Sequence, residues 1–339
     1  MTIRIGLIGS GNISQTHAQA AHQVAGAEIC AVYGTNAATV EILSRQNTAK
    51  AFTDFDAFLA HRPMDMVMIG TPSGLHAEQG IAAIRAGLHV LTEKPMDITT
   101  VRADSLIKAA DERGLKVGVI FQDRLKPEII ELKHSLCSGA LGKIVLVDAR
   151  VKWYRPPEYY SQSRWRGTFE LDGGGALMNQ GVHTVDLLLW LFGEVAKVQA
   201  TLRTAQHAIE VEDTALAILE FAKGPLCSFL ATTAAYPGYP RRVEITGSNG
   251  TVILEDDRIV ASALMGSKDK SDKTPIEDEG AASHVVSDVR GHKAILENFI
   301  QAIEQNGHPV CDAREGRKSI ALMEAIYRAS RNASGGGAN

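Results

Sequence analysis

The sequence predicts an α/β chain of two domains: a Rossmann domain with a doubly wound parallel sheet over residues 1–122, and an α+β domain with a large, mostly antiparallel open sheet over residues 123–339. In the first, apolar runs of strand length alternate with segments of helical period, which is typical of βαβ units. After residue 122, longer strand-like runs follow one another, which is typical of an antiparallel or mixed sheet. The length of 339 residues suits two domains of about 100 to 200 residues each.

The elements of the first domain alternate regularly. Strands are predicted at Ile3–Ile8, Glu28–Tyr33, Asp65–Ile69, His89–Leu91 and Lys116–Ile120. The helices between them are predicted at Ile13–Val24, Ala38–Gln46, Leu75–Ala86 and Val101–Arg113. Gly87 and Gly114 directly follow two of these helices, at the position where a C-terminal cap often places glycine.

The second domain is richer in strands. They are predicted at Ile144–Trp153, Ala196–Leu202, Thr214–Phe221, Leu226–Thr232 and Val243–Thr246, with one strongly helical segment, Gly175–Phe192, inserted among them. Residues 264–287 are polar and irregular and are predicted to be a mobile loop. Helices near 289–305 and 316–330 close the chain, and Ser334–Asn339 is expected to fray.

Composition excludes several classes of protein. Hydrophobic residues make up 45% and charged residues 22% of the chain, which is ordinary for a globular protein and disfavours disordered or fibrous classes. The 35 basic residues against 39 acidic ones give a net charge of 35 − 39 = −4. Because no stretch concentrates positive charge, we expect neither a nucleic-acid partner nor an anionic membrane partner.

The chain also shows no signal for a membrane span or a metal cage. Its longest strongly apolar run, Leu187–Phe192, is far shorter than the ~18 residues that a span needs, and the N-terminus begins with a strand rather than a signal peptide. The four cysteines lie far apart, which argues against both a zinc cage and a disulfide framework. We therefore expect a cytoplasmic protein with reduced thiols and no metal.

A glycine-rich turn follows the first predicted strand and opens the first helix. It reads Gly9-Ser10-Gly11-Asn12-Ile13-Ser14. Gly-x-Gly-x-x-small in this setting brings backbone amides against a dinucleotide pyrophosphate at the positive end of the helix. The sequence therefore predicts a nucleotide site that includes Gly9, Gly11, Asn12 and Ile13; the alternative is a purely structural turn.

The end of the second strand bears on the choice between NAD and NADP. NAD sites usually have Asp or Glu there, but this chain reads Tyr33-Gly34-Thr35-Asn36. The missing carboxylate removes repulsion toward a 2′-phosphate, yet the nearest downstream basic residue is Arg45. Thr35 and Asn36 are therefore candidates for the ribose end of the site, and the choice of cofactor stays open.

A lysine stands at the carboxyl end of a further predicted strand. Thr92-Glu93-Lys94-Pro95 follows His89–Leu91, and open α/β sheets bind ligands at this edge. Pro95 restricts Lys94 to an extended or turn conformation. Taken alone, Lys94 would be a solvated surface lysine, so its interpretation depends on the rest of the chain.

Several motifs together resemble the glucose-fructose oxidoreductase, inositol dehydrogenase and rhizopine-catabolism (Gfo/Idh/MocA) family over nearly the whole chain. They are the glycine turn, Thr71-Pro72-Ser73 with His76, Glu93-Lys94-Pro95, and Asp172–Gly175 leading to Asn179 and His183. The resemblance implies an NAD- or NADP-dependent dehydrogenase acting on a sugar, cyclitol or derivative. It also implies a homodimer or homotetramer formed through the open sheet of the second domain.

The family's catalytic set is a Lys from Glu-Lys-Pro and an Asp-x-x-x-His pair on one helix. The resemblance therefore implies catalytic roles for Lys94, Asn179 and His183, and residues four apart share a helical face. Neutral His183 would take the hydroxyl proton during hydride transfer while Lys94 stabilises the developing alkoxide, although these roles can be exchanged. Asn179 replaces the family's Asp and cannot carry charge.

The resemblance also assigns smaller roles. It places Thr71, Pro72, His76, Glu93, Gln122, Trp165 and Arg166 at the cofactor, together with Lys94, and it places Arg124, Tyr154, Asn179 and His183 at the substrate. The stretches Lys152–Pro157 and Tyr159–Gly167 look most like the branch that includes dehydrogenases of nucleotide-linked amino-sugar uronates. An anionic or bulky sugar would suit Arg155, Arg164 or Lys152.

Two other functions compete with a dehydrogenase. An NAD-dependent glycosidase would oxidise and re-reduce its substrate on a recycled cofactor, and would release free sugar with no net cofactor reduction. A dinucleotide-binding sensor would be catalytically silent. The presence of both Lys94 and His183 argues against the sensor.

Overall fold

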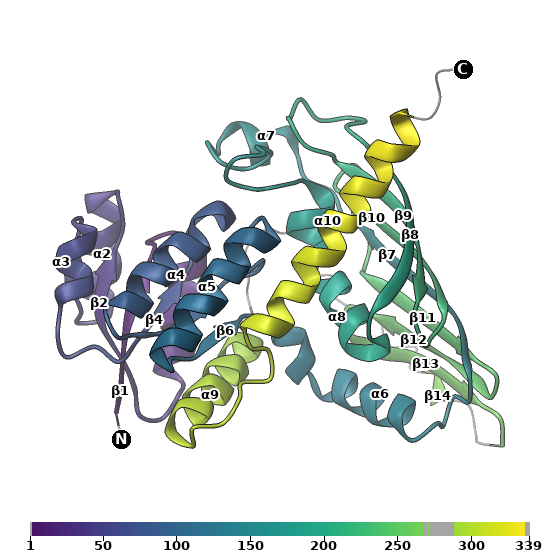
Figure 1. The fold of residues 1–339 in the computed structure, drawn as a ribbon, viewed down its shortest axis with the longest axis horizontal. Coiled ribbons are helices and arrows are strands. Elements are labelled where there is room, and N and C mark those ends of the chain that lie inside the picture. Colours follow the sequence, from purple (N-terminus) through teal and green to yellow (C-terminus); the bar gives the residue numbers. More distant parts are fainter. Residues whose placement is uncertain (1, 267–269, 272–287, 336–339) are drawn as a thin grey trace. The chain divides into compact units, whose positions relative to one another are not determined.

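The computed structural model describes residues 2–266, 270–271 and 288–335, and the chain divides into two compact units (Figure 1). The first unit comprises residues 1–122 together with 285–320, and the second comprises 123–284 and 321–339. The sequence placed all of 123–339 in one domain and gave no sign that 285–320 returns to the first unit.

The first unit contains the predicted parallel sheet, which has six strands where the sequence indicated five. The strand order is β3-β2-β1-β4-β5-β6, the order of a doubly wound Rossmann sheet. The strands are β1 Ile3–Ile8, β2 Ala27–Tyr33, β3 Lys50–Phe52, β4 Met66–Ile69, β5 His89–Thr92 and β6 Val117–Val119. Strand β4 is buried along its whole length, which explains its continuous apolar sequence. The short edge strand β3 was not predicted, because its three residues are largely exposed.

Helices connect these strands, and polar caps begin several of them. They are α1 Asn12–His22, α2 Ala37–Gln46, α3 Phe55–Ala60, η1 Ser73–Leu75, α4 His76–Arg85 and α5 Thr100–Arg113. Asp54 and Thr99 accept hydrogen bonds from backbone amides at the starts of α3 and α5. Gly87 and Gly114 have φ angles of 85° and 63°, so the two predicted glycine positions lie in the left-handed region.

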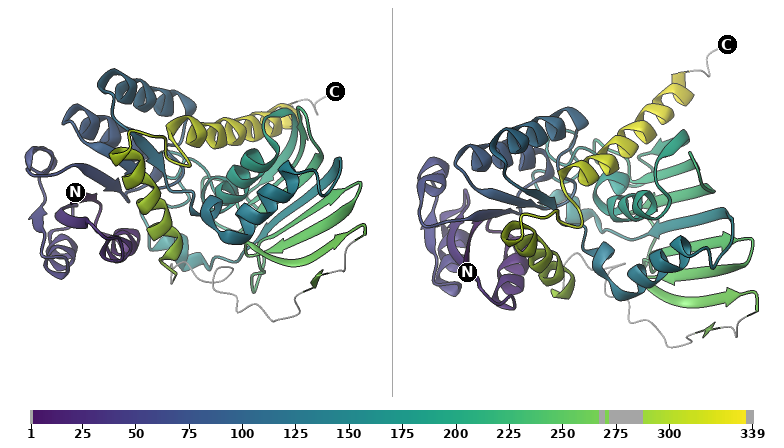
Figure 2. Two further views of the ribbon diagram at one scale, coloured as in Figure 1. Left: turned by 90° about the horizontal axis from the view of Figure 1, so that it is seen from below. Right: turned by 60° about the horizontal axis from the view of Figure 1, so that its bottom comes forward.

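Residues 285–320 return to this unit through specific contacts. Helix α9 (Arg290–Glu304) packs against α1 (Figure 2). Asp312 forms a β-bridge with Gly118, and Gly316, near the start of α10 (Ala313–Gly335), lies against Val119. These contacts bury the apolar face of α9, including Phe299, which packs over Gly118.

The second unit contains an eight-stranded sheet in the order β14-β13-β12-β11-β7-β10-β9-β8. The strands are β7 Ile144–Lys152, β8 Val195–Arg203, β9 Thr214–Phe221, β10 Leu226–Thr232, β11 Arg242–Gly247, β12 Gly250–Glu255, β13 Arg258–Leu264 and β14 Lys270–Ser271. In the described sheet, β7 and β10 are parallel and the other neighbours are antiparallel, which confirms the predicted class. The sequence missed β12 and β13, which meet at a tight turn where Asp256 and Asp257 have positive φ.

The two faces of this sheet differ in burial. Along β9, buried Ala215, Ala217 and Leu219 alternate with outward-facing Leu216 and Ile218. The inner face packs against a helical segment that begins as a π-helix, η3 (Ala176–Gly181), and continues as α8 (Val182–Phe192). The remaining helical elements are η2 Gln122–Leu125, α6 Pro127–Cys137 and α7 Pro157–Ser161.

Some predictions fall on parts of the chain with no structural description. Of the predicted loop 264–287, residues 267–269 and 272–287 lie outside the described residues, as do 336–339 of the predicted frayed end. The backbone of residues 334 and 335 is still part of α10, where fraying was expected. No helix in the described ranges is both long enough and apolar enough to cross a bilayer.

Candidate active site

The glycine turn has the backbone that a dinucleotide pyrophosphate needs. Gly9 has φ +115°, and a Cβ there would lie 2.8 Å from the carbonyl oxygen of Gly70, so only glycine fits. A Cβ at Gly11 would meet nothing within 4 Å. Gly11 is the N-cap of α1, which has no side-chain cap and no acidic residue in its first turn. The positive end of α1, including exposed Asn12 and half-buried Ile13, is therefore open to a phosphate group.

Ser14 occupies the third small position of this motif. Its hydroxyl oxygen would lie 3.0 Å from a Cβ on Gly9 and 3.1 Å from one on Gly70. The side chain is buried, and in the described part of the chain its oxygen has no hydrogen-bond partner. Serine is therefore tolerated here because it is small, and it lets α1 approach the sheet closely.

The end of β2 uses its polar residues locally. Asn36 caps α2, and its side-chain oxygen accepts hydrogen bonds from the amides of Ala38 at 3.0 Å and Thr39 at 3.3 Å. Thr35 is exposed. Arg45 is paired with Glu41 at 2.6 Å on the exposed side of α2. A helix cap therefore explains Asn36 without a cofactor contact.

His76 ties together the two strand ends that carry Thr71 and Lys94. Its Nδ1 lies 2.8 Å from the carbonyl oxygen of Pro95, and its Nε2 lies 2.9 Å from that of Thr71. The ring is 1% exposed, so both nitrogens are committed to the backbone. The Thr71 hydroxyl donates to Gln79 at 2.6 Å. In this structure His76 holds the loops that begin at Thr71-Pro72 and Glu93-Lys94-Pro95, rather than presenting a free side chain.

Glu93 forms a buried cluster with two histidines. Its Oε1 lies 2.9 Å from Nε2 of His17 on α1 and 3.5 Å from Nε2 of His292 on α9, and its Oε2 accepts the Lys94 amide at 3.2 Å. Burial alone would raise the pKa of Glu93, but the hydrogen bonds from both histidines lower it well below its usual range. Burial lowers the pKa of His17. The cluster is therefore an ionised Glu93 carboxylate held between two buried imidazoles.

The same three residues are also a possible set of metal ligands, although the sequence predicted no metal. Their ligand atoms lie within 4.8 Å of one another. Metal-bound histidines almost always donate their second ring N–H to an outer partner. The Nδ1 atoms of His17 and His292 are buried and have no such partner among the described residues. Hydrogen bonding to Glu93 therefore accounts for the geometry better than metal ligation.

Asn179 and His183 lie on the helical segment that covers the inner face of the second sheet. Asn179 is in the π-helix η3 and His183 in the first turn of α8, whereas one regular α-helix was expected. π-Helical turns are frequent at functional sites. Glu212 anchors the start of η3 by accepting the amides of Gly175 and Leu177 and the hydroxyl of Tyr327.

Two carboxylates near this segment were not assigned a role by the sequence. Asp172 accepts a hydrogen bond from the Asn179 amide at 2.8 Å and one from the Gly167 backbone at 2.9 Å. Asp123 Oδ2 lies 3.6 Å from Nδ1 of His183. Asp123 lies between Gln122 and Arg124, which the resemblance places at the cofactor and at the substrate. This neighbourhood could have identified Asp123 from the sequence.

Arg124, predicted to bind substrate, is fully engaged in the core of the second unit. It forms a two-pronged pair with Asp186, Nε to Oδ2 at 2.9 Å and a terminal nitrogen to Oδ1 at 2.7 Å, and both side chains are 2% exposed. The pair anchors α8 to η2. Gln122 precedes Asp123 and belongs to the first unit. Its buried side-chain oxygen has no hydrogen-bond partner in the described part of the chain, so this oxygen is available to accept a hydrogen bond from a ligand.

Aromatic rings and guanidinium groups gather in the segment before η3. The guanidinium groups of Arg155 and Arg166 lie 5.5 and 4.2 Å from the centre of the Tyr159 ring, and Arg166 also lies over Trp165 at 5.4 Å. Tyr154, predicted to bind substrate, meets Tyr236 edge to face at 5.2 Å. Gln180 of η3 donates to the Tyr159 hydroxyl at 3.4 Å, which links this cluster to the segment that carries Asn179.

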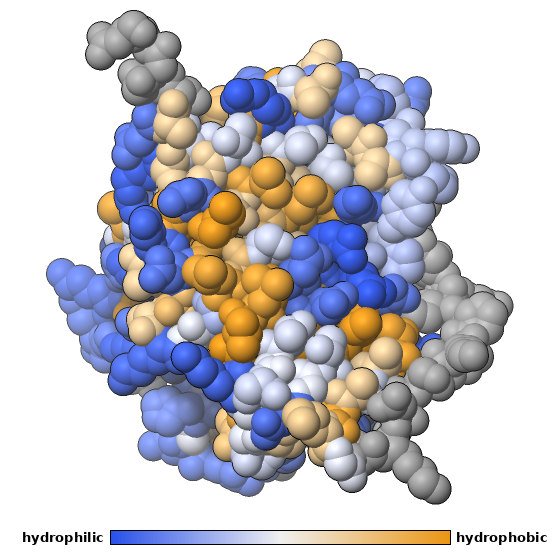
Figure 3. Space-filling model, turned by 90° about the vertical axis from the view of Figure 1, so that its right-hand side faces the viewer, coloured by the Kyte–Doolittle hydropathy of each residue, from blue (hydrophilic) through white to orange (hydrophobic). Residues whose placement is uncertain are grey.

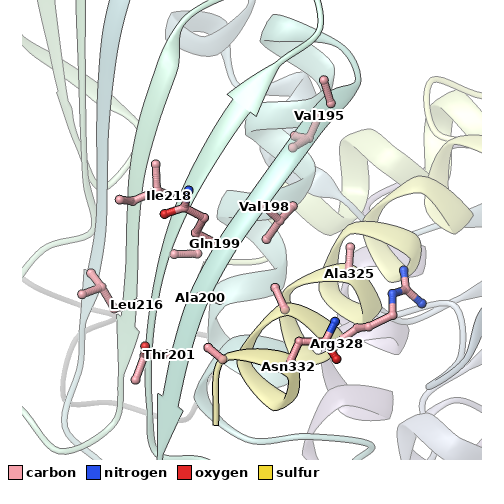
Figure 4. Close-up of a pocket in the computed structure, with 14 residues that line it drawn as sticks. Val195, Val198, Gln199, Ala200, Thr201, Leu216, Ile218, Ala325, Arg328 and Asn332 are labelled. Atoms are coloured by element: carbon pink, nitrogen blue, oxygen red, sulfur yellow. The ribbon is translucent and has the colours of Figure 1, made fainter. Parts of the chain in front are cut away.

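A separate groove in the second unit lies along β8, β9 and the C-terminal half of α10 (Figure 4). Its lining includes Val198, Leu216, Ile218, Ala325, Arg328 and Asn332. None of the predicted catalytic residues lines it, and it shares Leu216 and Ile218 with the outward face of the sheet. We therefore do not place the active site there.

The fold and these side chains together define a class of protein: a Rossmann-type nucleotide-binding unit joined to an α+β unit. Comparison with known proteins identifies the family. Residues 3–121 match the oxidoreductase family with an NAD-binding Rossmann fold, and residues 129–253 match the GFO/IDH/MocA C-terminal domain. The chain belongs to the Gfo/Idh/MocA family and is an NAD(P)-dependent oxidoreductase, which confirms the resemblance seen in the sequence.

Individual relatives span almost the whole chain. The inositol 2-dehydrogenase of Rhizobium meliloti is 27% identical over 97% of each chain, and the 1,5-anhydro-D-fructose reductase of Ensifer adhaerens is 27% identical over 96% of each. The crystal structure of the WlbA dehydrogenase from Bordetella pertussis, in complex with NADH and UDP-GlcNAcA, is 34% identical over 98% of each chain with a TM-score of 0.88.

Proposed function

We propose that this enzyme transfers hydride between a nicotinamide cofactor and a carbinol carbon of an anionic sugar derivative, such as a uronate or a nucleotide sugar. The observation that carries the substrate class is Arg155, which is only 4% exposed. Burial lowers the pKa of its guanidinium, and the positive charge of Arg166 lowers it further. Arg155 donates to the Tyr154 carbonyl, and its guanidinium lies near the Trp153 and Tyr159 rings. A planar guanidinium held in this way suits the two-pronged binding of a carboxylate or phosphate of the substrate.

The comparison with WlbA supports the same class, because that 34% identical structure holds UDP-GlcNAcA. The relatives named for inositol and anhydrofructose act on neutral compounds, so the family as a whole does not decide the substrate. The local environment of Arg155 favours the anionic class.

We assign the acid/base role to His183 and the stabilisation of the substrate oxygen to Lys94. When bound, the nicotinamide accepts or donates the hydride. His183 removes the hydroxyl proton as the carbon is oxidised, and Asn179 orients the substrate by hydrogen bonds. The open start of α1 at Gly9 and Gly11 binds the pyrophosphate, and Arg166 adds a planar fork for the same group.

The remaining assignments are proposals of the same kind. Asn12, Ile13, Thr35, Asn36, Thr71, Pro72, His76, Glu93, Gln122 and Trp165 complete the proposed cofactor site, and Tyr154 and Arg124 complete the substrate side. This role is indirect for four of them, because hydrogen bonds or ion pairs inside their own units hold the side chains of Asn36, His76, Glu93 and Arg124. They position neighbouring groups.

We also propose a cytoplasmic homodimer or homotetramer formed through the outward face of the large sheet. Leu146, Leu216, Ile218 and Leu226 are 47 to 53% exposed on this face (Figure 3). An apolar patch of this kind typically marks a protein interface. The exposed free thiol of Cys137 suits a reducing compartment.

A substrate screen tests the proposed function. Neutral sugars and cyclitols, uronates, and nucleotide sugars with and without a uronate carboxyl are offered with each cofactor, and the absorbance of the reduced nicotinamide is followed. We expect the highest kcat/KM for the carboxylated sugars. Turnover of neutral cyclitols at equal or higher kcat/KM would overturn the anionic assignment, and free sugar released without net cofactor reduction would indicate the glycosidase.

Substitution of Arg155 links that result to the structure. Arg155→Lys keeps the charge but loses the planar fork, so KM for the anionic substrate should rise about 10-fold or more, which corresponds to about 1.4 kcal/mol. KM for neutral sugars should change little. Arg203→Lys is the matched control, because Arg203 is an exposed arginine at the end of β8 with no proposed role in the site.

A further inference from the structure

We propose that Asp123 is a positioning residue for His183, and that its carboxylate holds the Nδ1 side of the imidazole so that Nε2 is presented to the substrate. This inference rests on the proposed role of His183 as the acid/base group. It supplies the carboxylate that the Asp-x-x-x-His motif lacks here, where Asn179 replaces Asp.

The geometry that suggests this role lies within the second unit. Oδ2 of Asp123 is 3.6 Å from Nδ1 of His183, and the two side chains are 7% and 14% exposed. Asp123 belongs to η2 and His183 to α8, so the carboxylate comes from a different element than in the family's motif. The Arg124–Asp186 pair, one residue along from Asp123, fixes the distance between η2 and α8.

Asp123 is held in its ionised form. A terminal nitrogen of Arg241 lies 2.8 Å from Oδ2, and Nζ of Lys126 lies 3.1 Å from Oδ1. Burial alone would raise the pKa of Asp123, but the charges of Arg241, Lys126 and His183 lower it far below its usual range. At 3.6 Å the contact with His183 is an ion-pair distance, longer than a hydrogen bond, and an ionised carboxylate at this distance attracts the Nδ1 side of the imidazole.

A structural ion cluster alone would not require this contact. Asp257, in the β12–β13 turn, also pairs with Lys126, at 2.5 Å, and with Arg241. Two carboxylates therefore already face two cations, and the contact with His183 is additional. Asp123 differs from Asp257 in this contact, which makes the two residues a matched pair for an experiment.

The chemical consequence concerns which ring nitrogen carries the proton. A carboxylate at Nδ1 favours the tautomer with N–H on Nδ1, which leaves the Nε2 lone pair free to accept a proton. When a bound nicotinamide takes the hydride from the carbinol carbon, the proton of that carbon's hydroxyl would pass to Nε2, and Asp123 would stabilise the resulting imidazolium. Removing the carboxylate disturbs both the tautomer and the ring orientation, as in other carboxylate–histidine pairs.

The test compares Asp123→Asn with Asp257→Asn in the full-length chain. Ring-labelled histidine NMR reports the tautomer and the pH midpoint of His183, whose resonances are assigned from a His183→Gln variant. Arg241 and Lys126 remain in Asp123→Asn, so the midpoint of His183 should move to lower pH and the Nδ1–H tautomer should lose population. Asp257→Asn should stay close to wild type in both respects.

Kinetics provide the second readout. Asp123→Asn should lower kcat/KM by about 10- to 100-fold, a part of the about 10² to 10⁴ that a positioned acid/base group contributes, with the dissociation constant for NADH unchanged. Asp257→Asn should remain within about twofold of wild type. Asp123→Glu keeps the charge and should retain a midpoint near that of wild type, which guards against poor folding of the Asn variant.

The outcomes separate this inference from the proposed function. An unchanged His183 tautomer and midpoint in Asp123→Asn, or equal effects of Asp123→Asn and Asp257→Asn, would overturn the role of Asp123. If no sugar is turned over by the wild-type protein, the proposed function fails while the NMR comparison still decides whether Asp123 positions His183.

Discussion

The side-chain amide of Asn179 donates a hydrogen bond to Oδ1 of Asp172 over 2.8 Å. Asn179 stands where the family has Asp, and it is therefore bonded to a neighbouring carboxylate. This contact changes what Asn179→Asp should do. Two carboxylates at that distance cannot both ionise easily, so one pKa of the pair rises and the two groups share a proton.

We therefore expect Asn179→Asp to keep part of the turnover at low pH and to lose it as rising pH removes the shared proton. The measurement is the pH profile of kcat/KM for the variant against wild type. Asn179→Leu, which cannot hydrogen-bond, should lower kcat/KM at every pH. Full activity of the Leu variant would place residue 179 outside the active site.

The second prediction separates binding from folding at the glycine turn. Gly11→Val should fold normally, because Gly11 has φ −88° and a Cβ there meets nothing within 4 Å. The side chain would fill the space of the pyrophosphate, so the dissociation constant for NADH should rise more than about 10-fold, or about 1.4 kcal/mol. Calorimetry measures the binding and thermal unfolding the stability.

Gly9→Val is the contrasting variant for that experiment. Its φ of +115° and the close carbonyl of Gly70 should make it unstable. NADH binding by Gly11→Val at wild-type affinity would remove the phosphate-binding assignment.

The third prediction concerns pH and Glu212. Burial raises the pKa of Glu212 to about 7. The hydrogen bonds from the amides of Leu177 and Gly175 lower this pKa, but their effect is smaller than that of burial. Between about pH 4.3, where glutamate ionises in an unfolded chain, and about pH 7, the folded chain keeps a proton that the unfolded chain has released. Stability therefore falls as pH rises through this window, by up to about 4 kcal/mol at about 1.4 kcal/mol per pKa unit.

Glu212→Gln stays neutral and should lose this part of the pH dependence. Urea unfolding of both proteins at several pH values between 4.5 and 7.5 measures the difference, which cancels the other titrating groups. A constant difference in stability across the series would show that Glu212 ionises normally.

The fourth prediction tests the apolar face of the large sheet. Replacing both Leu216 and Ile218 by Glu should dissociate the oligomer, because four charges would meet across a two-fold interface. Sedimentation velocity measures the mass. Ile42→Glu is the control, because Ile42 is similarly exposed at 56% but lies on α2 of the first unit. A monomeric wild-type protein would contradict the proposal.

Much of the fold could be predicted because local pattern and tertiary environment agree. The continuous apolar run of β4 fits a strand buried on both faces, and the strict alternation along β9 fits a strand with one buried face. The sequence did not predict the return of residues 285–320, since an amphipathic helix such as α9 does not specify which unit covers its apolar face.

The candidate site was predictable only where a motif carried it. Gly9, Lys94 and His183 belong to recognisable patterns, whereas Asp123 is brought close to His183, 60 residues away in sequence, only by the fold. His76 bonds to the Pro95 carbonyl and Arg124 pairs with Asp186. These tertiary contacts could not be predicted, because no local sequence pattern indicates them.

The last prediction is that Lys94 and His183 act on the same proton transfer. Lys94→Ala or His183→Ala should each lower kcat by about 10² to 10⁴, the usual contribution of a positioned acid/base group, with little change in the dissociation constant for NADH. Groups that act as a unit are not additive, so the double variant should be scarcely slower than the slower single variant.

The controls for this prediction remove the same side-chain types at exposed positions. Lys108→Ala, whose side chain is 78% exposed, and His134→Ala, which is also exposed, should leave kcat unchanged. Steady-state kinetics on the five variants, with cofactor binding measured separately, give the comparison. If His183→Ala keeps near-normal kcat while Lys94→Ala is inactive, Lys94 alone is the acid/base group. In that case the contact of His183 with Asp123 only stabilises the second unit, because a histidine that is not needed for proton transfer gains nothing catalytic from its orientation.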